Sequence, residues 1–128
     1  MGPAGRRFRF PDGSPVKLDG EAGLCGRANL AGGDWFGRGR IDICFGPYHG
    51  AGAGTDPEVI YVMESLDPAN LVVGRPQVVR LRDGTPLRHG GSYPAPELAD
   101  WDDDGRADLL LGGEDGSIWF YPRDSVTP

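Results

Sequence analysis

Residues 99–109 read Ala-Asp-Trp-Asp-Asp-Asp-Gly-Arg-Ala-Asp-Leu, and this stretch decides the fold prediction. Counting Asp100 as position 1, aspartates stand at positions 1, 3, 5 and 9, and a glycine at position 6 permits a sharp bend. Carboxylates spaced in this way converge on one point. Together with a main-chain carbonyl at position 7, they suit a hard cation with about six to eight oxygen ligands. We therefore expect a calcium loop rather than the simpler alternative, an exposed acidic turn. The four aspartates are Asp100, Asp102, Asp104 and Asp108.

The loop differs from an EF-hand, which also begins Asp-x-Asp-x-Asp-Gly. An EF-hand ends on a bidentate glutamate at position 12 and lies between two helices. Position 12 here is Leu111, within a Leu-Leu-Leu-Gly-Gly run that is typical of a buried strand entering a turn. The upstream flank, residues 92–96, reads Ser-Tyr-Pro-Ala-Pro, which a regular helix cannot accommodate. The sequence therefore argues against both EF-hand and dockerin loops.

The same pattern occurs a second time, 66 positions earlier in the chain. Residues 33–43 read Gly-Asp-Trp-Phe-Gly-Arg-Gly-Arg-Ile-Asp-Ile. The first and last aspartates are kept as Asp34 and Asp42, but Phe36 and Arg38 replace the two between them. Two carboxylates beside a guanidinium are too few oxygen donors for calcium. We expect this first loop to keep its shape without a metal, with the charge of Arg38 standing in for the ion.

Further matches extend the repeat on both sides of the loops. Upstream, residues 9–16 (RFPDGSPV) parallel residues 80–87 (RLRDGTPL), and each has an Asp-Gly pair typical of a hairpin. Downstream, each copy ends in an apolar run, at 58–63 and at 117–121. No stretch has the sustained 3.6-residue apolar period of a helix, and segment 64–72 can form one helical turn at most.

Each unit then holds about four short strands. In the second unit we expect them at 77–82, 85–88, 107–112 and 117–121, with weaker extended character at 95–99. Tandem units of this kind predict an all-β fold made of two four-stranded antiparallel blades of a β-propeller. The predicted divisions are a flexible N-terminus at 1–6, a first blade at 7–64 with the degenerate loop 34–42 and an insertion at 47–57, a linker at 65–75, a second blade at 76–123 with the intact loop 100–108, and a tail at 124–128.

The run from residue 99 to residue 121, ADWDDDGRADLLLGGEDGSIWFY, resembles a repeat of the FG-GAP/VCBS propellers, which include integrin α-like and bacterial secreted proteins. The resemblance covers nearly the whole chain as two repeats. It implies calcium held by the side chains of Asp100, Asp102, Asp104 and Asp108 and by the carbonyl of Arg106. It also implies a propeller fold and an extracellular or periplasmic setting. Members of the family often serve adhesion or accompany polysaccharide-degrading modules.

Composition and charge exclude several classes of partner. The 128 residues carry 13 Lys and Arg against 19 Asp and Glu, and a net charge of −6 argues against nucleic acid. The basic cluster Arg6, Arg7 and Arg9 is interpreted as a solvated end. No segment approaches the length of a membrane span, and the N-terminus lacks the apolar stretch of a secretion signal. Cys44 lies in an apolar run typical of a buried free thiol, and whether it pairs with Cys25 stays open.

Other notable residues divide into packing and binding candidates. Trp35 and Trp101 hold equivalent places, which indicates packing between blades. Tyr48, His49 and Tyr93 lie in expected loops and are possible ligand-binding residues, although idle surface loops are commoner. No nucleophile elbow, zinc-binding His-Glu-x-x-His or phosphate-cradling loop is present, so we expect no catalytic centre in this chain.

Three hypotheses follow for the function. The first is a non-catalytic, calcium-stabilised propeller segment for carbohydrate or protein recognition. The second is the C-terminal fragment of a propeller-bearing polysaccharide lyase or hydrolase whose catalytic residues lie outside this chain. The third is a homo-oligomer in which several copies close one ring. In each case the partners are further propeller blades, supplied by a parent chain or by other copies.

Overall fold

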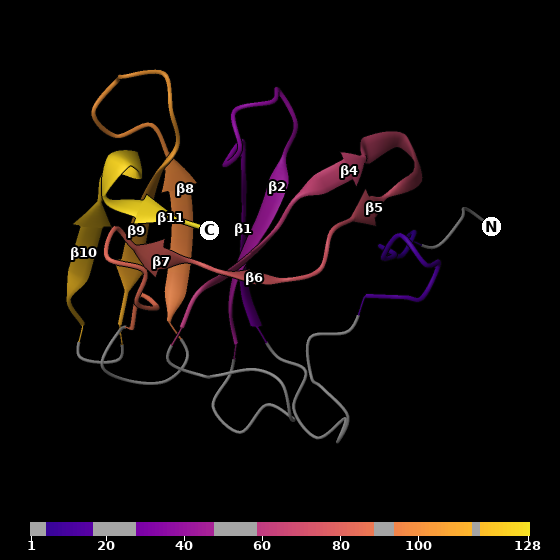
Figure 1. Cartoon of the computed structure of the whole chain (residues 1–128), viewed down its shortest axis with the longest axis horizontal. Helices are drawn as coiled ribbons and strands as arrows, with labels where there is room; N and C mark the ends of the chain where they lie inside the picture. Colours follow the sequence, from indigo (N-terminus) through magenta and orange to yellow (C-terminus); the bar gives the residue numbers. More distant parts are fainter. Residues whose placement is uncertain (1–4, 17–27, 48–58, 89–93, 114–115) are drawn as a thin grey trace.

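The computed structural model describes residues 5–16, 28–47, 59–88, 94–113 and 116–128, and within them the protein is built from short antiparallel strands (Figure 1). Two single-turn 3-10 helices, η1 (Pro68–Asn70) and η2 (Arg123–Ser125), are the only helices there. The strands are β1 (Ala28–Gly33), β2 (Asp42–Pro47), β3 (Tyr61–Met63), β4 (Ser65–Asp67), β5 (Val72–Val73), β6 (Gln77–Val78), β7 (Arg80–Leu81), β8 (Ala95–Ala99), β9 (Asp108–Gly112), β10 (Ile118–Tyr121) and β11 (Val126–Thr127).

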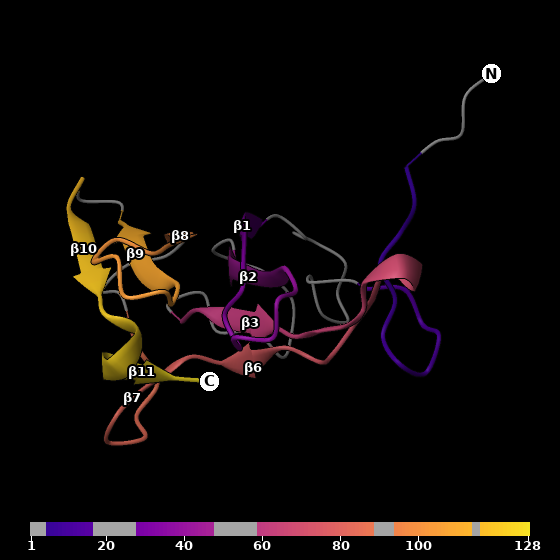
Figure 2. The same ribbon diagram turned by 90° about the horizontal axis from the view of Figure 1, so that it is seen from above.

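Two sheets carry the two repeats. The first sheet has the order β1-β2-β3-β6, and the second sheet has the order β10-β9-β8. Both are antiparallel throughout, and β4 with β5 and β7 with β11 form two additional pairs. The strands β1 and β8 lie side by side, and Figure 2 shows the two sheets diverging from that contact.

The close approach of the two sheets depends on glycine, at Gly33 in β1 and at Gly46 in β2. A Cβ at Gly46 would lie 2.1 Å from the carbonyl oxygen of Pro94, and a Cβ at Gly33 would lie 2.7 Å from the Cβ of Leu98. The side chain of Asn29 adds a hydrogen bond from Nδ2 to the Pro94 carbonyl at 3.3 Å. The two sheets therefore meet backbone to backbone at this edge.

The repeated hairpins at 9–16 and 80–87 have the same internal hydrogen bonds. Phe10 N–H donates to the Ser14 carbonyl just as Leu81 N–H donates to the Thr85 carbonyl, at 2.9 and 2.8 Å. Val16 N–H likewise bonds the Phe8 carbonyl, as Leu87 N–H bonds the Val79 carbonyl. Gly13 and Gly84 take left-handed φ angles of 88° and 90°, which close both turns. Residues 8–16 thus have the local structure of residues 79–87.

The apolar core lies on both sides of the first sheet. One cluster fills the space between the two sheets, and a second cluster fills the opposite face of the first sheet. The first cluster is made of Ala31, Trp35, Cys44, Ile60, Val62, Val79, Leu87, Leu98, Leu109, Leu111 and Val126. The second is made of Phe10, Phe45, Val59, Tyr61, Met63 and Val73.

The all-β prediction is confirmed, and so is the limit of one helical turn in segment 64–72, where η1 forms. The first sheet has four strands, but only three of them come from the predicted first blade at 7–64, and the second sheet has three among the described residues. Three strand assignments are corrected: Gln77–Val78 completes the first sheet, segment 85–88 forms only isolated bridges, and segment 95–99 is the edge strand of the second sheet next to β1. The first correction arises because the outer strand of the first sheet is supplied by the chain that follows the first unit. Among the described residues, no helix is long and apolar enough to cross a membrane.

Candidate metal centre

The second loop, residues 100–108, connects β8 to β9 and is shaped by hydrogen bonds to its own carboxylates. Asp100 accepts from the N–H groups of Asp104 and Gly105, at 3.0 and 2.8 Å. The turn also requires two left-handed residues, Gly105 with φ 88° and Asp103 with φ 61°. Aspartate tolerates this conformation better than most residues do. The sequence at these positions therefore folds the acidic stretch into one tight turn.

Asp108 fixes the far end of the loop in the protein interior. It is fully buried at the first residue of β9. Its Oδ2 accepts from Trp101 N–H at 3.0 Å, and its Oδ1 accepts from Arg123 N–H at 2.8 Å. A buried carboxylate needs such partners, because burying a charge without them is costly. Asp108 consequently joins the second loop to the segment that follows β10.

Four carboxylates of the second loop gather around one point. Ligand oxygens of Asp100, Asp102, Asp104 and Asp108 all lie within 4.8 Å of one another. Partial desolvation and then the charges of Asp104 and Asp108 raise the pKa of Asp102. The Arg106 N–H bond, at 2.9 Å, lowers the pKa of Asp104. This group can hold a metal ion, because a cation would offset the mutual repulsion of the carboxylates.

The first loop, residues 34–42, has the same backbone framework. Asp34 accepts from the N–H groups of Arg38 and Gly39 at 2.9 and 2.8 Å, in the places of Asp104 and Gly105. Asp42 is buried and accepts from Trp35, Phe36 and Ser65 N–H groups, at 2.9, 3.1 and 2.8 Å. The shape predicted for this loop is therefore present. Its metal-free state stays a prediction.

The expected role of Arg38 needs correction. Its guanidinium forms an ion pair with Glu64, which lies outside the loop, between β3 and β4. The sequence suggested that this charge would stand in for an ion beside Asp34 and Asp42. Because Arg38 has a long, largely exposed side chain, it reaches past the loop to a carboxylate that the repeat pattern does not contain.

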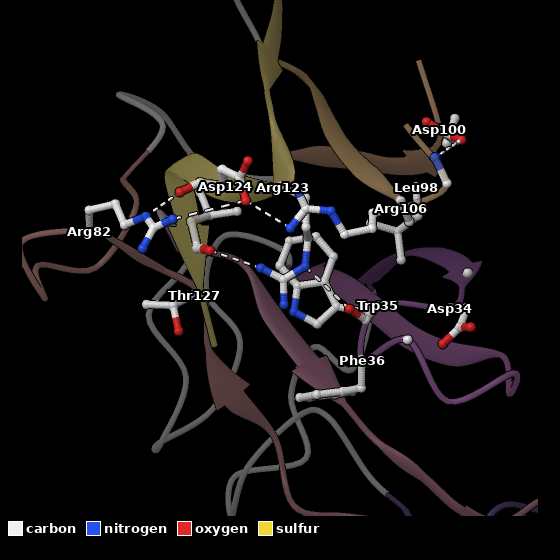
Figure 3. Close-up of a pocket in the computed structure, with 16 residues that line it drawn as sticks. Asp34, Trp35, Phe36, Arg82, Leu98, Asp100, Arg106, Arg123, Asp124 and Thr127 are labelled. Atoms are coloured by element: carbon white, nitrogen blue, oxygen red, sulfur yellow. Dashed lines mark hydrogen bonds and ion pairs between the residues drawn. The ribbon is translucent and has the colours of Figure 1, made fainter. Parts of the chain in front are cut away.

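A surface pocket of about 640 Å³ lies between the two loops (Figure 3). Trp35 is buried at its base, and the Arg123 guanidinium lies 4.0 Å from the centre of the Trp35 ring. Arg123 also donates from Nε to the Trp35 carbonyl at 3.2 Å and from Nη1 to the Val126 carbonyl at 2.8 Å. Since the Arg123 N–H also bonds Asp108, this one residue connects the second loop to the first.

The charged rim of the pocket centres on Asp124. Arg106 contacts it at 2.7 Å, and the side chain of Arg82 bonds the Asp124 backbone carbonyl (Figure 3). These contacts lower the pKa of the Asp124 carboxyl, the Arg106 hydrogen bond being the largest cause. Sequence reasoning missed Arg82, Arg123 and Asp124. They lie outside the repeated motif, and the one signal that could have found Arg123 was its place two residues after the last expected strand, 117–121.

The remaining predicted site residues divide into three groups. Tyr48, His49 and Tyr93 lie outside the described residues, as does Cys25. Cys44 is a buried free cysteine, and burial raises its thiol pKa to about 12. Trp35 packs between the two sheets as predicted. Trp101 is largely exposed, so the packing prediction is wrong for it in this structure.

Comparisons with known proteins do not identify a family for this chain, so any functional assignment rests on its own residues. No family model, curated protein or solved structure matches the chain.

Proposed function

We propose that this chain is a non-catalytic, calcium-stabilised segment of a β-propeller that serves carbohydrate or protein recognition. The proposal is carried by the four carboxylates of the second loop, whose ligand oxygens lie within 4.8 Å of one another. An all-oxygen donor set of this kind matches calcium better than a transition metal, which prefers nitrogen and sulfur ligands. The resemblance to FG-GAP/VCBS repeats favours the same ion and adds the carbonyl of Arg106 as a fifth ligand.

Calcium in the second loop would stabilise the contact between the units as well as the loop. The buried ligand Asp108 bonds the backbone of Arg123, and Arg123 covers the ring of Trp35 in the first loop. Holding Asp108 in place therefore holds the junction between the sheets. Extracellular calcium modules bind the ion with a Kd of about 10⁻⁴–10⁻³ M, and a weak affinity of this order suits a loop whose other three carboxylates are exposed. We accordingly place the protein in an extracellular or periplasmic setting.

The recognition role draws on the pocket between the loops. Its rim combines the guanidinium groups of Arg82 and Arg106 with the carboxylates of Asp34 and Asp124. Such paired charges offer both donors and acceptors to hydroxyl and carboxylate groups of a glycan or a protein loop. The pocket borders both loops, so calcium in the second loop would also rigidify its wall.

Thermal unfolding with calcium and with chelator tests the metal proposal. At free calcium about 100-fold above Kd, calcium should stabilise the fold by about 2.7 kcal/mol, and titration calorimetry should give one calcium site per chain. Asp104→Ala should abolish both effects. The control Asp34→Ala alters the first loop at the equivalent of Asp100 and should leave calcium binding intact. Equal melting temperatures with and without calcium, or binding that survives Asp104→Ala and vanishes in Asp34→Ala, would refute the proposal.

A further inference from the structure

The outer edge of β10 carries exposed apolar side chains. Ile118 is 79% exposed and Phe120 is 41% exposed, and Trp119 between them is also exposed. Within the part of the chain that the structure describes, no strand pairs with β10 on the side away from β9. An open edge strand of this composition is a template for pairing with another chain.

In the first sheet, the edge equivalent to the open edge of β10 is covered by another strand. Phe45 pairs with Tyr61 and Leu111 pairs with Trp119, and Phe45 and Leu111 are equivalent in the repeat. This register makes β3 the counterpart of β10. In the first sheet β6 lies along β3, with Tyr61 opposite Val78, and Val79 N–H donates to the Ile60 carbonyl at 2.9 Å. The residues of β3 are buried as a result.

The chain contains a second segment that is equivalent to residues 77–79. The hairpins 9–16 and 80–87 have the same hydrogen bonds. In each, the last residue donates to the carbonyl of the residue just before the hairpin, Phe8 in one case and Val79 in the other. Residues 6–8, here called the arm, therefore correspond to residues 77–79. Val79 is fully buried in the core between the sheets, whereas its counterpart Phe8 is exposed.

We propose that the arm of a second copy of this chain pairs with β10 as the fourth strand of the second sheet. The register of the first sheet, transferred to the second, puts Arg7 opposite Trp119 and directs the Phe8 N–H to the Ile118 carbonyl. Phe8 then covers Ile118 and Phe120, as Val79 is buried with Ile60 and Val62. This inference rests on the proposed function, since it names the partner that continues the propeller segment.

Shape and charge both favour a second copy as the partner. Residues 5–16 and β10 lie at opposite ends of the molecule, so the arm of the same copy does not lie near β10 (Figures 1 and 2). Residues 5–16 contain three arginines and one aspartate, whereas residues 94–128 contain nine acidic residues and two arginines. The two ends are thus complementary in charge, and such complementarity fixes the orientation of an encounter. Contacts of this head-to-tail kind build rings or open arrays.

Mass measurement with a matched pair of variants tests the interface. Ile118→Lys places a charge on the edge of β10, whereas Ile41→Lys changes another exposed isoleucine, 67% exposed, that lies away from β10. By light scattering at tens of micromolar, we expect species heavier than one 13.7 kDa chain for the wild type and for Ile41→Lys, and a monomer for Ile118→Lys. A monomeric wild type, or equal masses for the two variants, would overturn the proposal and leave a segment of a longer polypeptide as the occupant.

Disulfide trapping between copies tests the register. Residues opposite each other in a non-hydrogen-bonded antiparallel pair have Cα atoms about 4.5 Å apart, within the range of a disulfide. Arg7→Cys and Trp119→Cys, mixed as separate proteins in a Cys25→Ser background, should form a covalent heterodimer on oxidation. Arg7→Cys mixed with Ile118→Cys should yield several-fold less, because a shift of one residue places the thiols on opposite faces. Equal trapping of both mixtures, or none, contradicts the proposed pairing.

Repeating both measurements with calcium-binding assays separates this inference from the proposed function. A chain that binds calcium but stays monomeric retains the metal proposal and loses the strand pairing. A chain that traps Arg7→Cys with Trp119→Cys but shows no calcium effect retains the pairing and loses the metal proposal.

Discussion

Trp35 and Trp101 occupy the same position in the two loops, but Trp35 is 3% exposed and Trp101 is 70% exposed. Their backbone environments match, since the N–H group of each donates to the buried aspartate that ends its loop. The difference comes from outside the loop: Trp35 is covered by Arg123, which belongs to the next unit along the chain. Burial in this molecule is thus determined by the neighbouring unit, as in other repeat proteins.

The largest effect on stability is expected when each tryptophan is replaced in turn. Trp35→Ala should lower the free energy of unfolding by about 3–5 kcal/mol, because it empties a packed site between the sheets. Trp101→Ala should change it by no more than about 0.5 kcal/mol, as for most exposed positions. Urea denaturation, at concentrations where the chain is monomeric, measures both. Equal losses would mean that Trp101 packs as Trp35 does and that the units do not differ in burial.

A second test converts the first loop into a copy of the second. Phe36→Asp combined with Arg38→Asp restores carboxylates at loop positions 3 and 5, on a backbone already held by Asp34 and Asp42. Calorimetry should then show two calcium sites per chain, and calcium should add up to about 2.7 kcal/mol of stabilisation at 100-fold excess over the new Kd. The control combines Phe36→Ala with Arg38→Ala, which removes the same side chains without adding ligands. A single calcium site in both doubly substituted proteins would show that loop shape and carboxylates are insufficient for calcium binding.

The smallest effect concerns Cys44 and its counterpart Leu110, which is only partly buried. The thiol pKa of Cys44 rises from 9.0 to about 12 on burial, so the folded state retains its proton at pH values where the unfolded state loses it. The contribution of this group to the free energy of unfolding is fully present well below pH 9 and declines as the pH rises toward 12. At pH 9 the loss is about 0.4 kcal/mol. Urea denaturation between pH 7 and 9.5, in a Cys25→Ser background, should show this decline.

Thiol labelling supplies the control for that comparison. In the folded protein a thiol reagent should modify Leu110→Cys much faster than it modifies Cys44, because the thiolate is the reactive form and burial disfavours it. Comparable labelling rates, or a stability that does not change between pH 7 and 9.5, would contradict the burial of Cys44.

The sequence was sufficient to predict the features that a single unit determines. Loop 100–108 could be found because its aspartates and glycine make the turn themselves, through bonds such as those from Asp104 and Gly105 to Asp100. The hairpins were predicted for the same reason, since the Asp-Gly pairs close their own turns.

The features that could not be predicted depend on contacts between units. Gln77–Val78 was assigned to the second unit because it precedes the second hairpin, but its partner is β3 of the first sheet. Arg123 was missed because nothing in its local sequence shows that it covers Trp35, 88 positions away. The exposure of Trp101 could not be predicted either, because no pattern within a unit states whether another unit lies beside it.

The glycine contact between the sheets also has a geometric consequence. Gly46 of β2 faces the carbonyl of Pro94, just before β8, and Gly33 of β1 faces the side chain of Leu98 in β8, with no room for a methyl group at either glycine. The wedge angle between neighbouring units is set at this edge, and in a circular arrangement that angle dictates how many units complete the circle. In the proposed propeller, a side chain at position 46 would widen this angle, so a single methyl group there would alter the curvature of the ring.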